Sequence, residues 1–214
     1  RVFQRLLKLK DADVGRIATF VMAETLAAGS AVVDAFGVHA KVETLDSDGR
    51  GSLSDAAAKA STDFTTVPRA GDDLAAILYT SGTTGRSKGA MLTHDNLASN
   101  SLSLVEYWRF TKDDVLIHAL PIYHTHGLFV ASNVTLFSRA AMIFLPKLDP
   151  ELMIKLMDRA TVMMGVPTFY TRLLQSPNLS KDSTKHMRLF VSGSAPLLAE
   201  THREWSARTG HAVL

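Results

Sequence analysis

The chain has 214 residues, of which 46% are hydrophobic and 21% charged, so it can bury a sizeable core and is neither disordered nor fibrous. A formal net charge of +2 without a dense basic run disfavours a nucleic-acid partner. The lack of cysteine excludes disulfides and thiolate sites, and no apolar run reaches the roughly 18–20 residues of a membrane span, so we expect a cytoplasmic protein.

The first third of the chain predicts short elements with weak periodicity. In chain order they are a helix over 16–28, strands over 31–33 and 41–45, a turn over 46–51, and an alanine-rich helix over 54–60. The polar stretch over 61–73 contains proline and glycine and predicts a connector. We therefore expect residues 1–72 to form an incomplete N-terminal subdomain piece.

Strands and helices alternate from residue 73 onward. The strands are predicted over 74–79, 90–92, 115–120, 141–145, 161–166 and 187–192. The helices are predicted over 95–105, 150–159, 167–175 and 198–209. Between the strands that end at 120 and begin at 141, only a turn rich in proline, histidine and glycine is predicted. This alternation predicts an α/β layered fold for 73–214, with mostly parallel sheets flanked by helices.

The segment with the most distinctive chemistry follows the strand predicted over 74–79, which is expected to be buried. It reads Tyr79-Thr80-Ser81-Gly82-Thr83-Thr84-Gly85-Arg86-Ser87-Lys88-Gly89. Its glycines let backbone N–H groups approach an anion, and its hydroxyls and two cations can bind phosphate oxygens, so it suits a triphosphate. It differs from the common P-loop because its lysine precedes a glycine and not a serine or threonine. The alternative is a flexible, solvated hairpin between two strands.

This string resembles the phosphate-binding loop of the adenylate-forming superfamily, which includes acyl-CoA synthetases, luciferases and the adenylation domains of peptide synthetases. Three further segments resemble that superfamily in the expected order: Leu120–Gly127, Gly165–Tyr170 and Ser192–Leu197. The resemblance covers nearly the whole chain from Asp73 onward and is loose before it. Within the superfamily, the sequence most resembles the ligases that join malonate to coenzyme A.

The resemblance implies a reaction in two steps. A carboxylate reacts with ATP to give acyl-AMP and pyrophosphate, with Mg²⁺ bridging the phosphates, and the thiol of coenzyme A then displaces AMP. The residues expected to bind the β- and γ-phosphates are Thr80, Ser81, Gly82, Thr83, Thr84, Gly85 and Lys88. The residues expected to hold adenine are Gly193, Ser194 and Ala195. A nucleophilic serine in this turn is the rival interpretation, but the Gly-x-Ser-x-Gly elbow is absent.

His124 is the expected catalytic residue. The resemblance puts it at the wall of the acyl pocket, near the reacting carboxylate and the α-phosphate. Two alternatives are a metal site formed with His126, for which no further ligands are visible nearby, and an ordinary buried histidine.

Arg172 and Ser192 are the residues expected to bind the second carboxylate of malonate or methylmalonate. Arg172 follows the segment Gly165–Tyr170 near a predicted helix start, and a guanidinium is a natural bidentate partner for a carboxylate. The alternative for Arg172 is a charge on a helix surface. Arg188 is a weaker candidate and is interpreted as a surface charge at a strand end.

Three parts that the resemblance implies have no counterpart: an acidic metal ligand, a ribose-binding aspartate, and a C-terminal lid with a catalytic lysine. We expect the acidic ligand to lie beyond Leu214, so that the chain is an internal piece of a longer N-terminal domain and is inactive alone. Two other functions stay open. One is ligation of a fatty or aryl acid to coenzyme A, and the other is nucleotide binding without catalysis.

Overall fold

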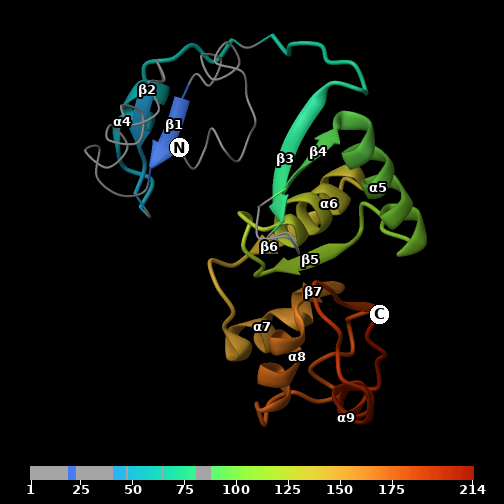
Figure 1. Ribbon diagram of the computed structural model, residues 1–214. Coiled ribbons are helices and arrows are strands. Elements are labelled where there is room, and N and C mark those ends of the chain that lie inside the picture. Colours follow the sequence, from blue (N-terminus) through green and yellow to red (C-terminus); the bar gives the residue numbers. More distant parts are fainter. Residues whose placement is uncertain (1–18, 23–40, 47, 64, 81–87) are drawn as a thin grey trace. The chain divides into compact units, whose positions relative to one another are not determined.

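The structure is a computed structural model that describes residues 19–22, 41–46, 48–63, 65–80 and 88–214. The chain divides into two compact units, Arg1–His94 and Asp95–Leu214 (Figure 1). This division falls later than the boundary expected after residue 72, so the strands that follow the connector group with the N-terminal unit and not with the larger α/β portion.

The first unit contains a parallel pair of strands where the sequence predicted a helix. β1 (Thr19–Met22) pairs with β2 (Lys41–Thr44), and Thr19 lies opposite Lys41. The helix predicted over 16–28 is therefore wrong at β1, because its apolar and β-branched residues suit a strand equally well and pairing with β2 satisfies the backbone. The rest of that helix and the strand predicted over 31–33 lie outside the described residues.

The turn after β2 is built around the side chain of Asp46. Its Oδ1 accepts hydrogen bonds from the backbone N–H groups of Asp48 at 2.9 Å and Arg50 at 2.8 Å. The short helix α4 (Ser52–Ala57) follows, slightly earlier than predicted. The carboxylate of Asp46 thus stabilises the turn predicted over 46–51 by accepting hydrogen bonds from its backbone, as is common for aspartate in turns.

An antiparallel hairpin completes the first unit. β3 (Leu74–Thr80) pairs with β4 (Lys88–Thr93), and Tyr79 lies opposite Gly89. A Cβ on Gly89 would come within 2.9 Å of an isoleucine side chain on β3, so glycine permits this close approach. The strand predicted over 74–79 is present, but its predicted burial is wrong, since Leu74 is 46% exposed; a two-stranded ribbon gives its side chains little cover.

The second unit is built on a four-stranded sheet whose strands all run parallel. Across the sheet the order is β6 (Ala141–Phe144), β5 (Val115–His118), β7 (Val162–Gly165) and β8 (Leu189–Ser192). Its central residues, such as Leu116 and Met163, are fully buried, as expected for a sheet covered on both faces. Val213 extends the sheet through a parallel bridge to Phe190. The predicted α/β fold with a mostly parallel sheet is confirmed.

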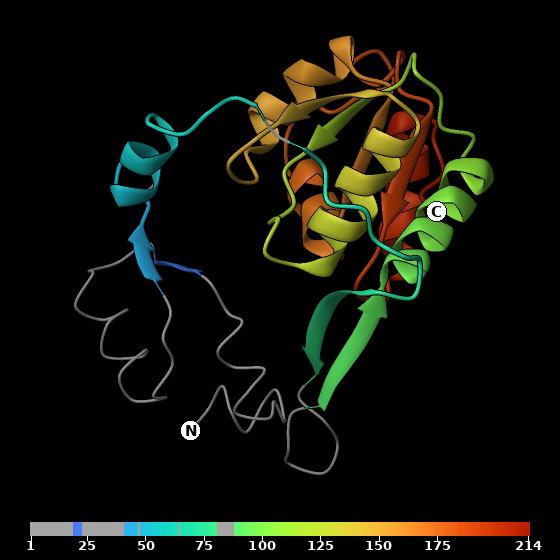
Figure 2. The same cartoon turned by 90° about the horizontal axis from the view of Figure 1, so that it is seen from above.

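Helices cover both faces of this sheet. In chain order they are α5 (His94–Tyr107), the π-helix η1 (His126–Ser132), α6 (Asn133–Phe137), α7 (Pro150–Leu156), the 3₁₀ turn η2 (Met157–Arg159), α8 (Pro167–Leu174) and α9 (Ala199–Thr209). Figure 1 shows α6 on one side of the sheet and α7, α8 and α9 on the other, and Figure 2 looks onto the face that α6 crosses. No helix in the described ranges is long and apolar enough to cross a membrane.

The helix boundaries follow local signals where those signals are strong. At the start of α7, Asp149 Oδ1 accepts a hydrogen bond from the N–H of Leu152 at 3.1 Å, and a proline occupies the first turn. α9 ends at Thr209, and the Gly210 that follows has a φ of 79°, in the left-handed region that favours glycine. The helical stretch formed by η1 and α6 was not predicted, because serine, asparagine and threonine interrupt its apolar pattern.

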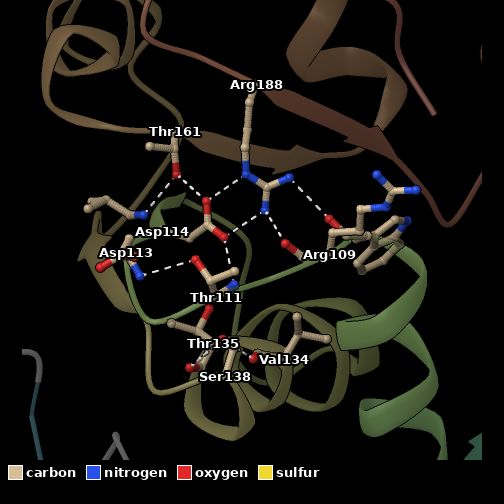
Figure 3. Close-up of polar contacts among 11 residues, drawn as sticks. Arg109, Thr111, Asp113, Asp114, Val134, Thr135, Ser138, Thr161 and Arg188 are labelled. Atoms are coloured by element: carbon tan, nitrogen blue, oxygen red, sulfur yellow. Dashed lines mark hydrogen bonds and ion pairs between the residues drawn. The ribbon is translucent and has the colours of Figure 1, made fainter.

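An ion pair and a hydrogen bond, both centred on Asp114, join the segments that lead into three of the parallel strands (Figure 3). Arg188 precedes β8, and its Nε and Nη2 donate to the two carboxylate oxygens of Asp114 at 2.7 and 2.6 Å. Asp114 precedes β5, is 4% exposed, and also accepts a hydrogen bond from the hydroxyl of Thr161, which precedes β7, at 2.8 Å. Arg188 is a partly exposed charge next to a strand end, as interpreted, with 37% of its side chain exposed, but its guanidinium is committed to a bidentate pair with the buried carboxylate of Asp114.

Aromatic side chains fasten α9 to β8. The ring of Trp205 lies 4.9 Å from those of both Tyr170 and Phe190, edge-on at 78° and 71°. The hydroxyl of Tyr170 donates to the backbone oxygen of Val191 at 2.7 Å. Burial raises the pKa of Tyr170 well above its ordinary value, so this donor keeps its proton. The end of β8 is thus held from one face of the sheet.

Candidate functional site

The carboxyl edge of the parallel sheet contains a point where the chain connections diverge. β5 and β7 are neighbours, but β5 connects to β6 on one side while β7 connects to β8 on the other. Loops that leave two such strands separate, and the crevice between them is where open α/β sheets bind ligands. His124 follows β5, and Gly193–Ala195 follow β8, so the topology places these predicted site residues at the same edge.

His118, the last residue of β5, fixes the π-helix at this edge. Its Nε2 donates to the backbone oxygen of Gly127 at 2.9 Å and lies 3.1 Å from the hydroxyl oxygen of Ser132. Burial lowers the pKa of His118, which keeps the ring neutral with its proton on Nε2. A Cβ on Gly127 would lie 2.2 Å from the backbone oxygen of Pro121, so this position in the first turn of the helix requires glycine.

His126 lies between His118 and the turn after β8. It is buried, and its Nδ1 lies 3.2 Å from Ser194 Oγ, within hydrogen-bond distance. Burial, followed by the charges of His124 and His118, lowers the pKa of His126 and keeps it neutral. Its backbone N–H donates to Nδ1 of the exposed His124 at 3.4 Å, which places the proton of a neutral His124 ring on Nε2.

The turn after β8, Ser192–Ala195, is named here the β8 turn. The N–H of Ser192 donates to the backbone oxygen of Leu214 at 2.7 Å, and that of Gly193 donates to Gly165 at 3.1 Å. Ser194 has a φ of 68°, in the left-handed region. Because Gly193 and Ala195 carry little or no side chain, a flat ring can approach the backbone of this turn.

A cavity of about 430 Å³ opens beside this edge. Its walls come from the loop after β5, the loop after β6 and the first turn of α8; they are Ala119–Tyr123, Phe144–Leu148 and Phe169. The lining is mostly apolar, with Lys147 as its one charged residue. Its volume is in the range of small-molecule sites. Gly165 lets Phe169 close over the end of β7, since a Cβ on this glycine would lie 2.9 Å from the phenylalanine ring.

The two residues predicted to bind the distal carboxylate differ in their surroundings. Ser192 Oγ is buried and has no hydrogen-bond partner among the described residues. Arg172 is exposed and lies in the last turn of α8, not near its start as expected. α8 turns its apolar residues, among them Tyr170 and Leu173, toward the core, so Arg172 lies outside that packed face.

The predicted phosphate loop is only partly described. Ser81–Gly85 lie outside the described residues, and Thr80 is the last residue of β3. Lys88 is the exposed first residue of β4. The role of this loop therefore stays a prediction.

The alternative of a metal site at His124 and His126 gains no support from the side chains around them. Within the part of the chain that the structure describes, no three histidine or acidic side chains gather closely enough to hold a metal ion. His126 instead uses its Nδ1 for the contact with Ser194. Sequence reasoning selected His124 and missed both His126 and His118, because spacing alone does not tell which imidazole is buried.

A parallel sheet with helices on both faces and small residues after its strands defines an α/β protein of the class that binds ligands at the carboxyl edge of its sheet. The chain matches the AMP-binding enzyme family over residues 9–214. It therefore belongs to that family, which agrees with the resemblance of its motifs.

Within this family, the chain is similar to a malonate–CoA ligase and to solved structures of MatB. The chain is 38% identical to a malonate–CoA ligase of Arabidopsis thaliana over 163 residues, and the match covers 67% of this chain and 27% of that protein. It is 73% identical to apo MatB from Rhodopseudomonas palustris, with a TM-score of 0.86 over 91% of this chain and 38% of MatB. ATP-bound MatB is 74% identical to the chain, with a TM-score of 0.85 over 91% of this chain and 39% of MatB.

A more distant solved structure is a malonyl-CoA ligase in a ternary product complex with methylmalonyl-CoA and AMP. It is 29% identical, with a TM-score of 0.70 over 94% of this chain and 52% of that protein. The chain thus spans about a quarter to a half of the length of these relatives.

Proposed function

We propose that this chain carries the nucleotide- and acid-binding part of an ATP-dependent ligase that joins malonate or methylmalonate to coenzyme A. The observation that carries the proposal is the 74% identity to ATP-bound MatB over 91% of the chain. The crevice at the divergence of β5 and β7, with its neutral histidines and glycine turn, supports it. We also propose a cytoplasmic location, which cell fractionation tests.

The chemistry has two displacements. A carboxylate oxygen attacks the α-phosphorus of ATP and pyrophosphate leaves; the thiol sulfur of coenzyme A then attacks the acyl carbon, loses its proton, and AMP leaves. His124 suits a hydrogen-bond donor to the phosphoryl or carboxylate oxygens, because Nδ1 accepts from His126 N–H and Nε2 keeps the proton. Gly193, Ser194 and Ala195 would hold adenine.

The phosphates and the metal belong to the loop before β4 in this proposal. Thr80, the segment Ser81–Gly85, and Lys88 would bind the β- and γ-phosphates through hydroxyls, backbone N–H groups and one ammonium. Mg²⁺ would neutralise phosphate charge.

Recognition of a second carboxylate rests on Ser192 and Arg172. The hydroxyl of Ser192 is buried and uncommitted among the described residues, so an acceptor oxygen would relieve the cost of leaving it unpaired. The side chain of Arg172 makes no hydrogen bond or ion pair within the described ranges, which leaves its guanidinium available.

The test is pyrophosphate exchange by the full-length protein with malonate, methylmalonate, acetate, a medium-chain fatty acid and benzoate. We expect exchange with the two dicarboxylates, and we expect Arg172→Ala to reduce it about tenfold or more, the effect of losing a charged hydrogen bond. Lys112→Ala, an exposed cation at the opposite edge, is the control. Exchange only with monocarboxylates would favour a fatty- or aryl-acid ligase, and nucleotide binding without any exchange would favour a non-catalytic module.

A further inference from the structure

His126 occupies a position that no part of the expected reaction uses. It is the first residue of η1, and its buried ring lies between the loop that carries His124 and the β8 turn. Its backbone contacts the ring of His124, and its side chain contacts the hydroxyl of Ser194. One residue thus touches both a candidate catalytic group and the candidate adenine site.

The β8 turn meets the ring of His126 at two residues, Gly193 and Ser194. A Cβ on Gly193 would lie 2.8 Å from Cε1 of His126, so the turn packs directly onto the imidazole. Ser194 has a φ of 68°, a conformation that is unfavourable for a non-glycine residue unless its surroundings hold it. The hydrogen bond with His126 Nδ1 is the only one that the Ser194 side chain makes within the described part of the chain.

The position of η1 is itself fixed. His118 donates to the backbone oxygen of Gly127, the residue after His126, and the hydroxyl of Ser132 donates to the same oxygen at 2.9 Å. Gly127 packs against the backbone of Pro121. The ring of His126 therefore projects from a rigid support, as a group that positions another must.

We propose that His126 is a positioning residue that holds the β8 turn in its nucleotide-binding shape, through the hydrogen bond to Ser194 and the packing of its ring on Gly193. The inference deepens the proposed function and rests on it, because the β8 turn is the expected adenine site. His126 does not touch the reacting atoms; it couples the turn to the loop that carries His124.

A double-mutant cycle in the full-length protein tests this, with AMP binding measured by calorimetry and with KM values from pyrophosphate exchange. We expect Ser194→Ala and His126→Leu each to weaken AMP binding and raise the KM for ATP about three- to tenfold, the value of one neutral hydrogen bond. The double variant should be no worse than His126→Leu alone, because both changes remove the same contact. The KM for the carboxylate should change little, and His126→Asn, which keeps a polar group near Nδ1, should recover part of the affinity. His186→Asn, an exposed histidine at the amino edge of the sheet, should match the wild type.

Additive losses in folded variants, or a His126→Asn variant as impaired as His126→Leu, would overturn the proposal. A ligand-free measurement separates it from the proposed function: Ser194→Ala should shift the ¹⁵N resonances of the His126 ring in the NMR spectrum. Unchanged ring resonances would overturn the positioning role even in an active enzyme. Failure of AMP to bind the wild type, with the resonance shift present, would instead overturn only the proposed function.

Discussion

Asp114 and His126 are both buried polar residues, but the fold keeps Asp114 ionised and His126 neutral. Burial alone would raise the pKa of Asp114, but the hydrogen bonds led by that from Arg188, together with the charge of Arg188, outweigh burial and hold the pKa below its ordinary value. Around His126, burial and the neighbouring histidines lower the pKa instead. The amino edge of the sheet therefore carries an ionised pair, while the carboxyl edge carries neutral imidazoles.

Removing the cation of this pair should destabilise the protein. Arg188→Ala leaves a buried carboxylate without its bidentate partner, and we expect the free energy of unfolding to fall by about 2 kcal/mol. Urea denaturation of the full-length protein measures this. Lys185→Ala, which removes an exposed pair with Asp182 at 3.1 Å, is the matched control and should change stability little. Equal effects of the two substitutions would contradict the buried-pair account.

The pair also predicts a dependence of stability on pH. Because the pKa of Asp114 is lower in the folded than in the unfolded chain, its carboxylate stabilises the fold above the unfolded value of about 3.9, and this contribution is lost as the pH falls through the folded value. The stability difference between wild type and Asp114→Asn should therefore shrink on acidification. Asp182→Asn should show no such trend, and a constant difference for Asp114→Asn would count against the assignment.

At the scale of elements, the π-helix η1 depends on a single close approach. Gly127→Ala would place a Cβ 2.2 Å from the backbone oxygen of Pro121, which cannot move like a side chain. We expect the overpacking to lower the free energy of unfolding by about 1–3 kcal/mol and to reduce activity. The control is Gly49→Asn, a turn glycine with φ of 75° and no atom within 4 Å of an added Cβ, which should be tolerated. Thermal melting compares them.

The parallel strands were predicted and the η1–α6 stretch was not, for one physical reason. β7 reads Val-Met-Met-Gly and is wholly buried, so an apolar run is visible in the sequence. In the missed stretch, polar side chains bond within the helix: Thr135 Oγ1 donates to Ala131 O at 2.8 Å, and Ser132 Oγ to Gly127 O at 2.9 Å. Such residues resemble surface or turn residues in a pattern, although here Thr135 is buried and Ser132 is half-buried.

The parts of the candidate site that depend on local glycine and small residues were predicted from the sequence. The parts that depend on contacts between distant segments were missed. Glycine next to small residues after β8 marks a turn that can approach a ligand, and this was predicted. The contact of His126 with Ser194 spans residues far apart in the chain and appears only when β5 and β8 are placed in one sheet. The helix predicted over 16–28 failed at β1 for a similar reason, since pairing with β2 overrides local periodicity.

At the scale of the whole molecule, the core lies in the second unit. Among the described residues, every buried hydrophobic side chain falls between Phe110 and Val213. The hairpin β3–β4 contributes exposed residues instead, including Lys88. Substitutions in the hairpin should therefore affect ligand binding without affecting the stability of the second unit.

Lys88→Ala in the full-length protein should raise the KM for ATP about tenfold or more, because it removes the charged contact to the phosphates that we propose for this side chain. The unfolding transition of the second unit should stay the same, since the side chain is exposed and lies outside that core. Lys112→Ala, equally exposed, should leave both quantities unchanged. Unchanged ATP kinetics in Lys88→Ala would remove the loop from the nucleotide site.

The aromatic contacts of α9 have an optical consequence. The chain contains two tryptophans, and only Trp205 is sealed from solvent, stacked edge-on against the strand that ends in the β8 turn. Its indole should emit at short wavelength, and a Trp108→Phe background would isolate that signal. Fluorescence of this one native chromophore then follows, in real time and without a label, any rearrangement that a nucleotide causes at the end of the strand.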